Sequence, residues 1–276
     1  MRLERASREL YCKPWAIMPA TYQTFHEVFQ RHLDNGFDAK TVKIMGEEFE
    51  YKVPQEYDIV NGVAVISIDG VLGHRLSGFE KACMGAVDYS DIQEAISKAE
   101  NDESVSSIVL DINSPGGMVT GLHETAVRIT ESTKPVVAYS DSLVASAGYY
   151  LACSASSVFV SGSSQIGCIG TLMTWTDVSK RMEMLGLKTE MIASGKYKGM
   201  LFPGIPVTDE QRELLEDNVD TLATSFKNFV VDRRGNVPES LMEGQTVFGA
   251  EAKAGLLIDE IGTLADAIYE AAEIAG

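Results

Sequence analysis

The sequence has 276 residues, with 40 acidic and 23 basic side chains and a formal net charge of −17. This balance argues against a nucleic-acid partner and against an anionic membrane surface, because both require clustered basic residues. The first ten residues mix arginine with glutamate and contain no apolar run, so we expect no secretory signal and no membrane anchor, and a cytoplasmic location.

The four cysteines are scattered along the chain, without a CxxC pair or a histidine at ligand spacing. They predict reduced thiols, with neither a disulfide framework nor a metal site, and no cofactor is expected. They are Cys12, Cys83, Cys153 and Cys168.

Residues 1–60 are predicted to form a helical N-terminal extension, and residues 61–276 a second domain. In the extension, apolar residues recur at helical spacing over 25–33, and Asn35-Gly36 would end that helix. From Gly62 onward, strands and helices alternate, which predicts an α/β fold with a mostly parallel sheet. The expected strands are 62–70, 105–112, 135–140, 157–160, 169–175, 187–194 and the last one within 256–262; the expected helices are 88–100, 118–130, one beginning near 145, 208–233, 249–255 and 263–275.

One stretch of 35 residues, 142–176, contains no charged side chain. It also carries several serines and glycines, so it is not apolar enough for a transmembrane helix. In a chain as acidic as this one, an uncharged stretch is expected to run through the interior, where ionised side chains are costly.

Three segments carry residues that could do chemistry. INSPGGM, at 112–118, lies between an expected strand and an expected helix, where its glycines would expose N–H groups to a ligand; a simple tight turn explains it equally well. VASAGYY, at 144–150, places Ser146 at a second strand-to-helix turn, as in a nucleophile elbow, but without the GxSxG pattern. SGKYKGM, at 194–200, offers two lysines, which by themselves are more simply read as solvated surface residues.

A serine nucleophile needs a base. No histidine follows Ser146, and His123 is expected to be an ordinary surface or half-buried residue. A histidine base would therefore have to come from upstream of Ser146, and the other base known for a serine is a lysine kept neutral by burial.

Together, INSPGGM, SLVASAGYYLACSA, GSSQIGCIGTLM, IASGKYKG and GQTVFGAEAKAGLLIDEIG resemble the signal peptide peptidase A family of serine peptidases over about residues 60–270. That family uses a Ser–Lys dyad on a βαβ spiral shared with Clp protease and crotonase-type enzymes. The resemblance implies that Ser146 is the nucleophile and that Lys198, 52 residues later and selected over Lys196 by the SGxxK pattern, is the base.

The same resemblance implies further roles within the site. The backbone N–H groups of Gly117 and Ala147 would hold the oxyanion, and an extended peptide would add a strand just after SPGG. Lys198 is expected to lie against the uncharged stretch and Lys196 to face solvent. Cys168 stands where relatives have a serine that orients the lysine, so its thiol is expected near Lys198.

The first 60 residues resemble the tailed-phage branch of this family, the minor capsid protein C-like capsid-assembly proteases of phages and prophages. This implies an endopeptidase that processes scaffold protein in a procapsid or the host cytoplasm, acting as a homo-oligomer on a peptide or protein substrate. Three alternatives stay open: a cytosolic enzyme that degrades peptides, a crotonase-type acyl-CoA enzyme, and a non-catalytic procapsid ring component.

Overall fold

The computed structural model describes residues 13–24, 27, 57–76, 78, 80–81 and 85–276. The helix expected over 25–33 and its Asn35-Gly36 end therefore lie outside the described residues. Among the residues that are described, no helix is both long and apolar enough to cross a membrane.

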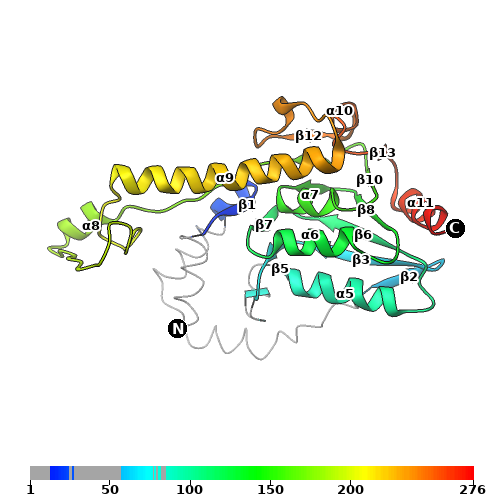
Figure 1. Cartoon of the computed structure of the whole chain (residues 1–276), viewed down its shortest axis with the longest axis horizontal. Helices are drawn as coiled ribbons and strands as arrows, with labels where there is room; N and C mark the ends of the chain where they lie inside the picture. Colours follow the sequence, from blue (N-terminus) through cyan, green and yellow to red (C-terminus); the bar gives the residue numbers. More distant parts are fainter. Residues whose placement is uncertain (1–12, 25–26, 28–56, 77, 79, 82–84) are drawn as a thin grey trace.

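A six-stranded sheet forms the centre of the molecule (Figure 1). Every neighbouring pair is parallel except the outermost pair, β2 with β3, which is antiparallel. This arrangement confirms the predicted α/β class with a mostly parallel sheet. In spatial order the strands are β13 (Glu260–Ile261), β10 (Ser157–Val160), β8 (Val136–Ser140), β6 (Ser107–Asn113), β3 (Val63–Asp69) and β2 (Asp58–Val60).

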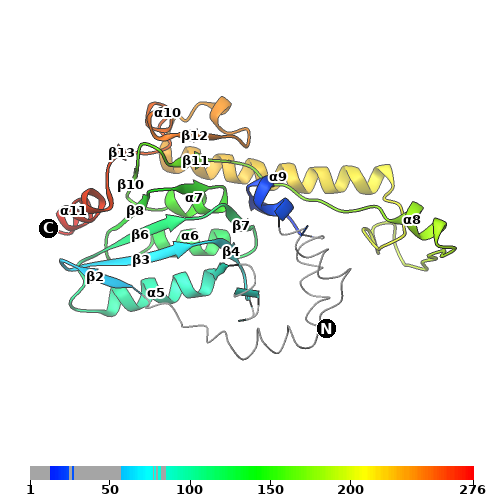
Figure 2. The same ribbon diagram turned by 180° about the vertical axis from the view of Figure 1, so that it is seen from behind.

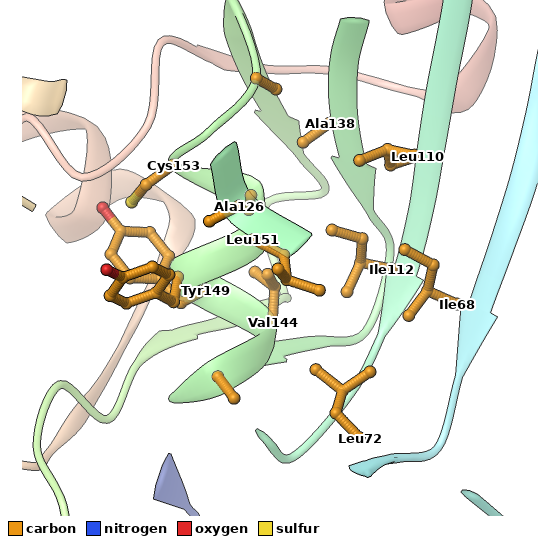
Figure 3. Packing of buried hydrophobic residues seen from close by; sticks show 14 of the residues in the cluster. Ile68, Leu72, Leu110, Ile112, Ala126, Ala138, Val144, Tyr149, Leu151 and Cys153 are labelled. Carbon is orange, nitrogen blue, oxygen red and sulfur yellow. The ribbon is translucent and has the colours of Figure 1, made fainter. Parts of the chain in front are cut away.

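Helices cover both faces of this sheet, so its inner strands are apolar on both sides. Alternate residues of β6 point to opposite faces: Leu110 joins the cluster under the helices α5, α6 and α7, whereas Val109 joins a second cluster under α11. Figure 3 shows Leu151 and Val144 packed toward Ile112 in the first of these clusters. The helices are α5 (Tyr89–Asn101), α6 (Leu122–Thr130), α7 (Ala147–Ala152) and α11 (Leu264–Ala275).

Two smaller sheets lie beside the central one and carry the candidate site. The first has the order β1-β7-β4-β5, and the second β12-β11-β9. Their strands are β1 (Trp15–Ile17), β4 (Val71–Gly73), β5 (Ala86–Asp88), β7 (Gly116–Met118), β9 (Leu143–Ala145), β11 (Gln165–Gly167) and β12 (Thr246–Phe248).

The longest helix, α9 (Asp209–Arg234), begins at a capping box, in which Thr208 and Gln211 bond to each other's backbone N–H groups. Tyr150 of α7 stacks on Phe229 of α9, with ring centroids 4.0 Å apart, and meets Phe226 edge-on at 5.0 Å. These aromatic contacts fix the C-terminal half of α9 on the body of the molecule. Its N-terminal half extends away toward α8 (Ser179–Met184), as both views show (Figures 1 and 2).

Between α9 and α11 the chain forms four short elements: the 3₁₀ turn Glu239–Leu241, the strand β12, the helix α10 (Gly249–Ala254) and the last strand, β13. The helix α10 and the strand β13 follow the order expected from the sequence, whereas the 3₁₀ turn and β12 have no predicted counterpart. The buried Arg234 side chain joins α9 to this region, because its guanidinium bonds to both carboxylate oxygens of Asp259 at 2.8 and 3.0 Å.

Three predicted elements are wrong. Residues 169–175 and 187–194 are not strands: the first makes one isolated bridge, between Leu172 and Trp15, and the second is exposed and pairs with no described strand. A strand needs a neighbouring edge with which to pair, and the described residues offer neither segment such an edge over its full length. The helix expected from residue 118 begins at Leu122, because Gly116–Met118 form β7.

Candidate active site

Ser146 sits between β9 and α7, at the strand-to-helix turn that the sequence predicts. Its backbone has φ 52° and ψ −119°, a conformation that costs a residue with a side chain about 1–3 kcal/mol. Hydrogen bonds on both sides hold it there: its N–H donates to Gly167 O at 2.7 Å, and its C=O accepts from the Tyr150 N–H at 2.9 Å. The turn therefore has the sharp, strained geometry of a nucleophile elbow.

Small residues allow the neighbouring strand ends to approach this turn closely. A Cβ on Gly116 would lie 2.9 Å from Ser146 Cβ, and a Cβ on Gly148 would lie 3.0 Å from Ser114 Cβ. Ser114, at the end of β6, accepts the Ala145 N–H at 3.0 Å and so ties β9 to the SPGG segment. Glycine at 116 and 148 is thus needed for the SPGG segment to lie against the serine turn.

The Ser146 hydroxyl is buried and has no polar partner. The residue is 1% exposed, and among the described residues its Oγ is one of two buried side-chain oxygen or nitrogen atoms without a hydrogen bond. A buried hydroxyl without a partner loses its bonds to water and gains none in return. Strain and an unpaired hydroxyl on the same residue are features that a reactive side chain explains and a packing role does not.

The two expected oxyanion donors lie on either side of this serine. Ala147 is the first residue of α7, where backbone N–H groups have no partner within the helix. Gly117 lies in the middle of β7, so the expectation that the SPGG glycines open a helix is wrong. Both donors are backbone groups of buried residues next to the elbow.

The structure does not bring Lys198 to Ser146 within one chain. Lys198 is exposed, and the expectation that it packs against residues 142–176 is not met. Lys196 pairs with Glu210 in the first turn of α9, whereas Tyr150 contacts Phe226, sixteen residues further along that helix. At 1.5 Å per residue, the lysine loop lies about 24 Å along α9 from the helix that follows Ser146.

Lys196 faces solvent, as expected. Its pairing with Glu210 raises its pKa, and its ammonium lies 4.9 Å from the centre of the Tyr197 ring. Most residues of the uncharged stretch are buried as far as Ile169, apart from its first residues, Ser156, the turn 161–163 and Gln165; the residues after Ile169 are partly or fully exposed.

Cys168 is buried directly after β11, with a positive φ of 52°, and its N–H donates to Gln245 O at 2.7 Å. Burial raises the pKa of its thiol to about 11. It follows Gly167, which accepts the Ser146 N–H, so it belongs to the walls of the serine site. Within the described part of the chain it makes no hydrogen bond to Lys198.

His123 is exposed and bonds to the Tyr150 hydroxyl at 3.0 Å through Nδ1, away from Ser146. It is a surface residue, as expected. Across the described ranges, no group of three or more His, Cys, Asp or Glu side chains is arranged to hold a metal.

Two parts of the site were not predicted from the sequence: Ser114 and the strand β1. Trp15, Ala16 and Ile17 pair antiparallel with β7, beside Ser146. Three residues are too few for a periodic pattern, and the pairing joins segments that are far apart in the sequence, so no local signal marks this contact.

The chain is similar in sequence to curated proteins from phages and bacteria. The chain is 28% identical over 83% of its length to "Capsid assembly protease C" of Escherichia phage lambda, covering 53% of that protein. It is 32% identical over 77% of its length to "Head-tail preconnector protein GP5" of Enterobacteria phage P21, covering 43% of it. It is 28% identical over 63% of its length to "Putative signal peptide peptidase SppA" of Enterococcus faecium, covering 52% of it. The chain thus spans about half the length of these curated relatives.

Solved structures similar to the chain include a ClpP1 mutant from Listeria monocytogenes and an enoyl-CoA hydratase/isomerase family member. The first has a TM-score of 0.48 and 15% identity, covering 74% of this chain and 94% of that one. The second has a TM-score of 0.42 and 17% identity, covering 79% of this chain and 72% of that one.

The family model "Peptidase family S49" matches residues 128–276. This match covers more than half of the sequence and includes Ser146, Cys168 and Lys198. The chain therefore belongs to peptidase family S49.

Proposed function

We propose that the protein is a serine endopeptidase with a Ser–Lys dyad. Ser146 Oγ attacks a peptide carbonyl while Lys198 takes its proton, and the N–H groups of Gly117 and Ala147 stabilise the oxyanion. The lysine then passes the proton to the departing amine as the C–N bond breaks. Water, deprotonated by the same lysine, hydrolyses the acyl-serine ester and frees Ser146. The steps need neither metal nor cofactor.

One observation carries this proposal: the unpaired, buried Ser146 hydroxyl on a strained elbow beside a glycine-rich strand, in a chain that belongs to a peptidase family. A crotonase-type enzyme would need the oxyanion turn but would have no reason to hold a serine in this conformation. A non-catalytic ring component would need neither the oxyanion turn nor the strained serine. The alternative of a general peptide-degrading enzyme uses the same dyad and differs only in substrate.

The base must then come from another copy of the chain, since Lys198 lies far from Ser146 of its own chain. The loop that carries it exposes apolar side chains for which a second copy would provide cover. These are Met184, Leu185, Leu187, Ile192 and Phe202, with exposed fractions of 88, 66, 56, 104 and 53%. We therefore propose a homo-oligomer in which this loop packs on a neighbouring subunit and places Lys198 at its Ser146.

The two phage relatives, one named for capsid assembly and one as a head-tail preconnector protein, support a role in phage head maturation, in which the substrate is a scaffold protein and the site of action is a procapsid or the host cytoplasm. The net charge of −17 fits a protein substrate better than nucleic acid. The division at residue 60 into an N-terminal extension and a peptidase domain belongs to the same proposal.

The test compares cleavage of a fluorogenic peptide library, and of scaffold protein encoded beside this gene, by wild-type protein and three variants. Ser146→Ala and Lys198→Met should abolish cleavage, whereas Lys196→Met, two residues away in the same exposed loop, should retain it. Cleavage by Ser146→Ala, or loss of cleavage in Lys196→Met with activity in Lys198→Met, would overturn the assignment. Cleavage of peptides without cleavage of scaffold would remove the capsid role and leave the peptidase.

A further inference from the structure

The chain's own segment Trp15–Ile17 occupies a slot of backbone hydrogen bonds beside Ser146. On one side it pairs antiparallel with β7, and the Met18 N–H extends this pairing by donating to Pro115 O at 2.8 Å. On the other side, Trp15 exchanges two bonds of 2.9 Å with Leu172. An extended segment held by backbone bonds along both edges is the way in which strand addition binds a peptide.

The register of this segment puts one particular carbonyl at the site. Hydrogen-bonded pairs alternate along an antiparallel ladder, so the Met18–Pro115 pair implies that Ala16 and Gly117 also form such a pair. The Gly117 N–H, the proposed oxyanion donor, therefore faces the carbonyl oxygen of Ala16. The same oxygen lies 2.2 Å from the point where a Gly116 Cβ would sit, and Ser146 Cβ lies 2.9 Å from that point.

The segment is also firmly packed. Trp15, Ala16 and Ile17 are 2, 1 and 2% exposed. The Trp15 ring meets the Tyr22 ring edge-on, with centroids 5.9 Å apart, and the Tyr22 hydroxyl accepts a bond of 2.8 Å from Thr174. Side-chain contacts thus hold the segment in place in addition to its backbone bonds.

A permanent structural strand at this position would block the proposed active site. With Trp15–Ile17 in place, Ser146 is 1% exposed, and the Gly117 N–H is already used. A substrate peptide would then reach neither the nucleophile nor this oxyanion donor. The segment must leave for the proposed reaction to occur.

We propose that Trp15–Ile17 is a built-in occupant of the substrate groove that keeps the peptidase closed until it is displaced. This inference rests on the proposed function and adds its regulation. When the segment leaves, the slot between β7 and Leu172 becomes free for a substrate strand. Because the occupant is tethered, it competes at a high effective concentration with any free peptide.

A reversible cross-link between the segment and β7 tests this proposal in the full-length chain. Trp15 and Met118 face each other in the register. They form a pair without mutual hydrogen bonds, and such pairs have Cα atoms about 4.5 Å apart, within the range of a disulfide. Trp15→Cys with Met118→Cys should therefore form a disulfide on oxidation that locks the segment in the groove. Each single-cysteine variant, treated identically, is the matched control.

Two readouts are followed in the oxidised and reduced forms. The first is the rate at which a fluorophosphonate labels Ser146. The second is binding of a fluorescein-labelled peptide copying residues 13–20, measured by anisotropy with Ser146→Ala added to the cysteine variants, and with a scrambled peptide as control. Oxidation should abolish labelling and peptide binding in the double variant, and reduction should restore both. The single-cysteine variants should not respond to oxidation.

The outcomes separate this proposal from the proposed function. If the disulfide does not form, if the oxidised double variant labels and binds peptide as the reduced form does, or if neither form binds the peptide, the segment is not a groove occupant. If no form is labelled but peptide binding still switches with oxidation, the occupant is real and Ser146 is not the nucleophile.

Discussion

Removing the Ser146 hydroxyl should make the protein more stable while it loses activity. Ser146 and Ser107 carry buried hydroxyls without a hydrogen-bond partner in the described residues, whereas the equally buried Ser164 hydroxyl bonds to Ser140 O at 2.9 Å and to Ser161 Oγ at 2.8 Å. These three serines form a matched set for alanine substitution.

The expected sizes follow from hydrogen-bond energetics. Leaving a buried polar group unsatisfied costs about 1–3 kcal/mol, so Ser146→Ala and Ser107→Ala should each raise the free energy of unfolding by up to this amount. Ser164→Ala should lower it by about 0.5–1.5 kcal/mol. In a domain of this size, each kcal/mol shifts the melting temperature by about 2–4 °C. Ser146→Gly should gain further from relief of the positive φ, less the greater entropy of glycine in the unfolded chain.

The assay is thermal and urea unfolding of all four variants at one fixed protein concentration, with peptide cleavage measured in parallel. Ser107→Ala separates the gain in stability from the loss of activity, because it should stabilise the protein without abolishing cleavage. If Ser146→Ala proves as destabilising as Ser164→Ala, the Ser146 hydroxyl has a hydrogen-bond partner in solution. The reasoning from an unpaired nucleophile would then be refuted.

Three further outcomes are expected. Mixing inactive Ser146→Ala with inactive Lys198→Met should restore part of the cleavage, because an oligomer then combines an intact serine with a neighbour's intact lysine; a mixture as inactive as its components would rule out sharing between subunits. The hydrogen bond from Arg128 lowers the pKa of Glu100 from 4.5 to about 2, so the stability from this pair is complete above about pH 4.5 and lost as the pH falls toward 2. In Glu100→Gln, the free energy of unfolding measured in urea should therefore change less with pH between about 4.5 and 2. The same pH dependence in wild type and variant would contradict the pairing. Burial raises the pKa of Cys168 to about 11, so iodoacetamide at about pH 8 should leave it unmodified in folded protein and alkylate it in urea, as peptide mass spectrometry would show.

Much of the fold could be predicted because its elements carry periodic patterns. The helix α9 has a capping box and a regular apolar stripe, and β3 and β6 are rich in valine and isoleucine, so their existence follows from local sequence. The strand β7 could not be predicted in this way, because Gly-Gly-Met has a poor strand propensity and is held by β1 and β4, which come from distant parts of the chain. The segment 187–194 has the composition of a strand, but the described residues give it no neighbouring edge with which to pair.

In the site, too, local features could be predicted and features that depend on distant parts of the chain could not. Ser146 could be found because a strand-to-helix turn is a local feature, and the structure adds the strain and the missing hydrogen bond. The distance between Ser146 and Lys198 could not be predicted, because it depends on how far α9 carries the lysine loop from the body. The occupation of the groove by Trp15–Ile17 depends on backbone bonds, which almost any three residues can make.

The measurement that tests the central claim most directly is covalent labelling of the wild-type protein by a fluorophosphonate, followed by peptide mass spectrometry. The account predicts a single adduct, on Ser146, that is absent from Ser146→Ala and strongly reduced in Lys198→Met, since without the lysine the hydroxyl is not activated. An adduct on another serine, with Ser146→Ala still cleaving peptides, would contradict it.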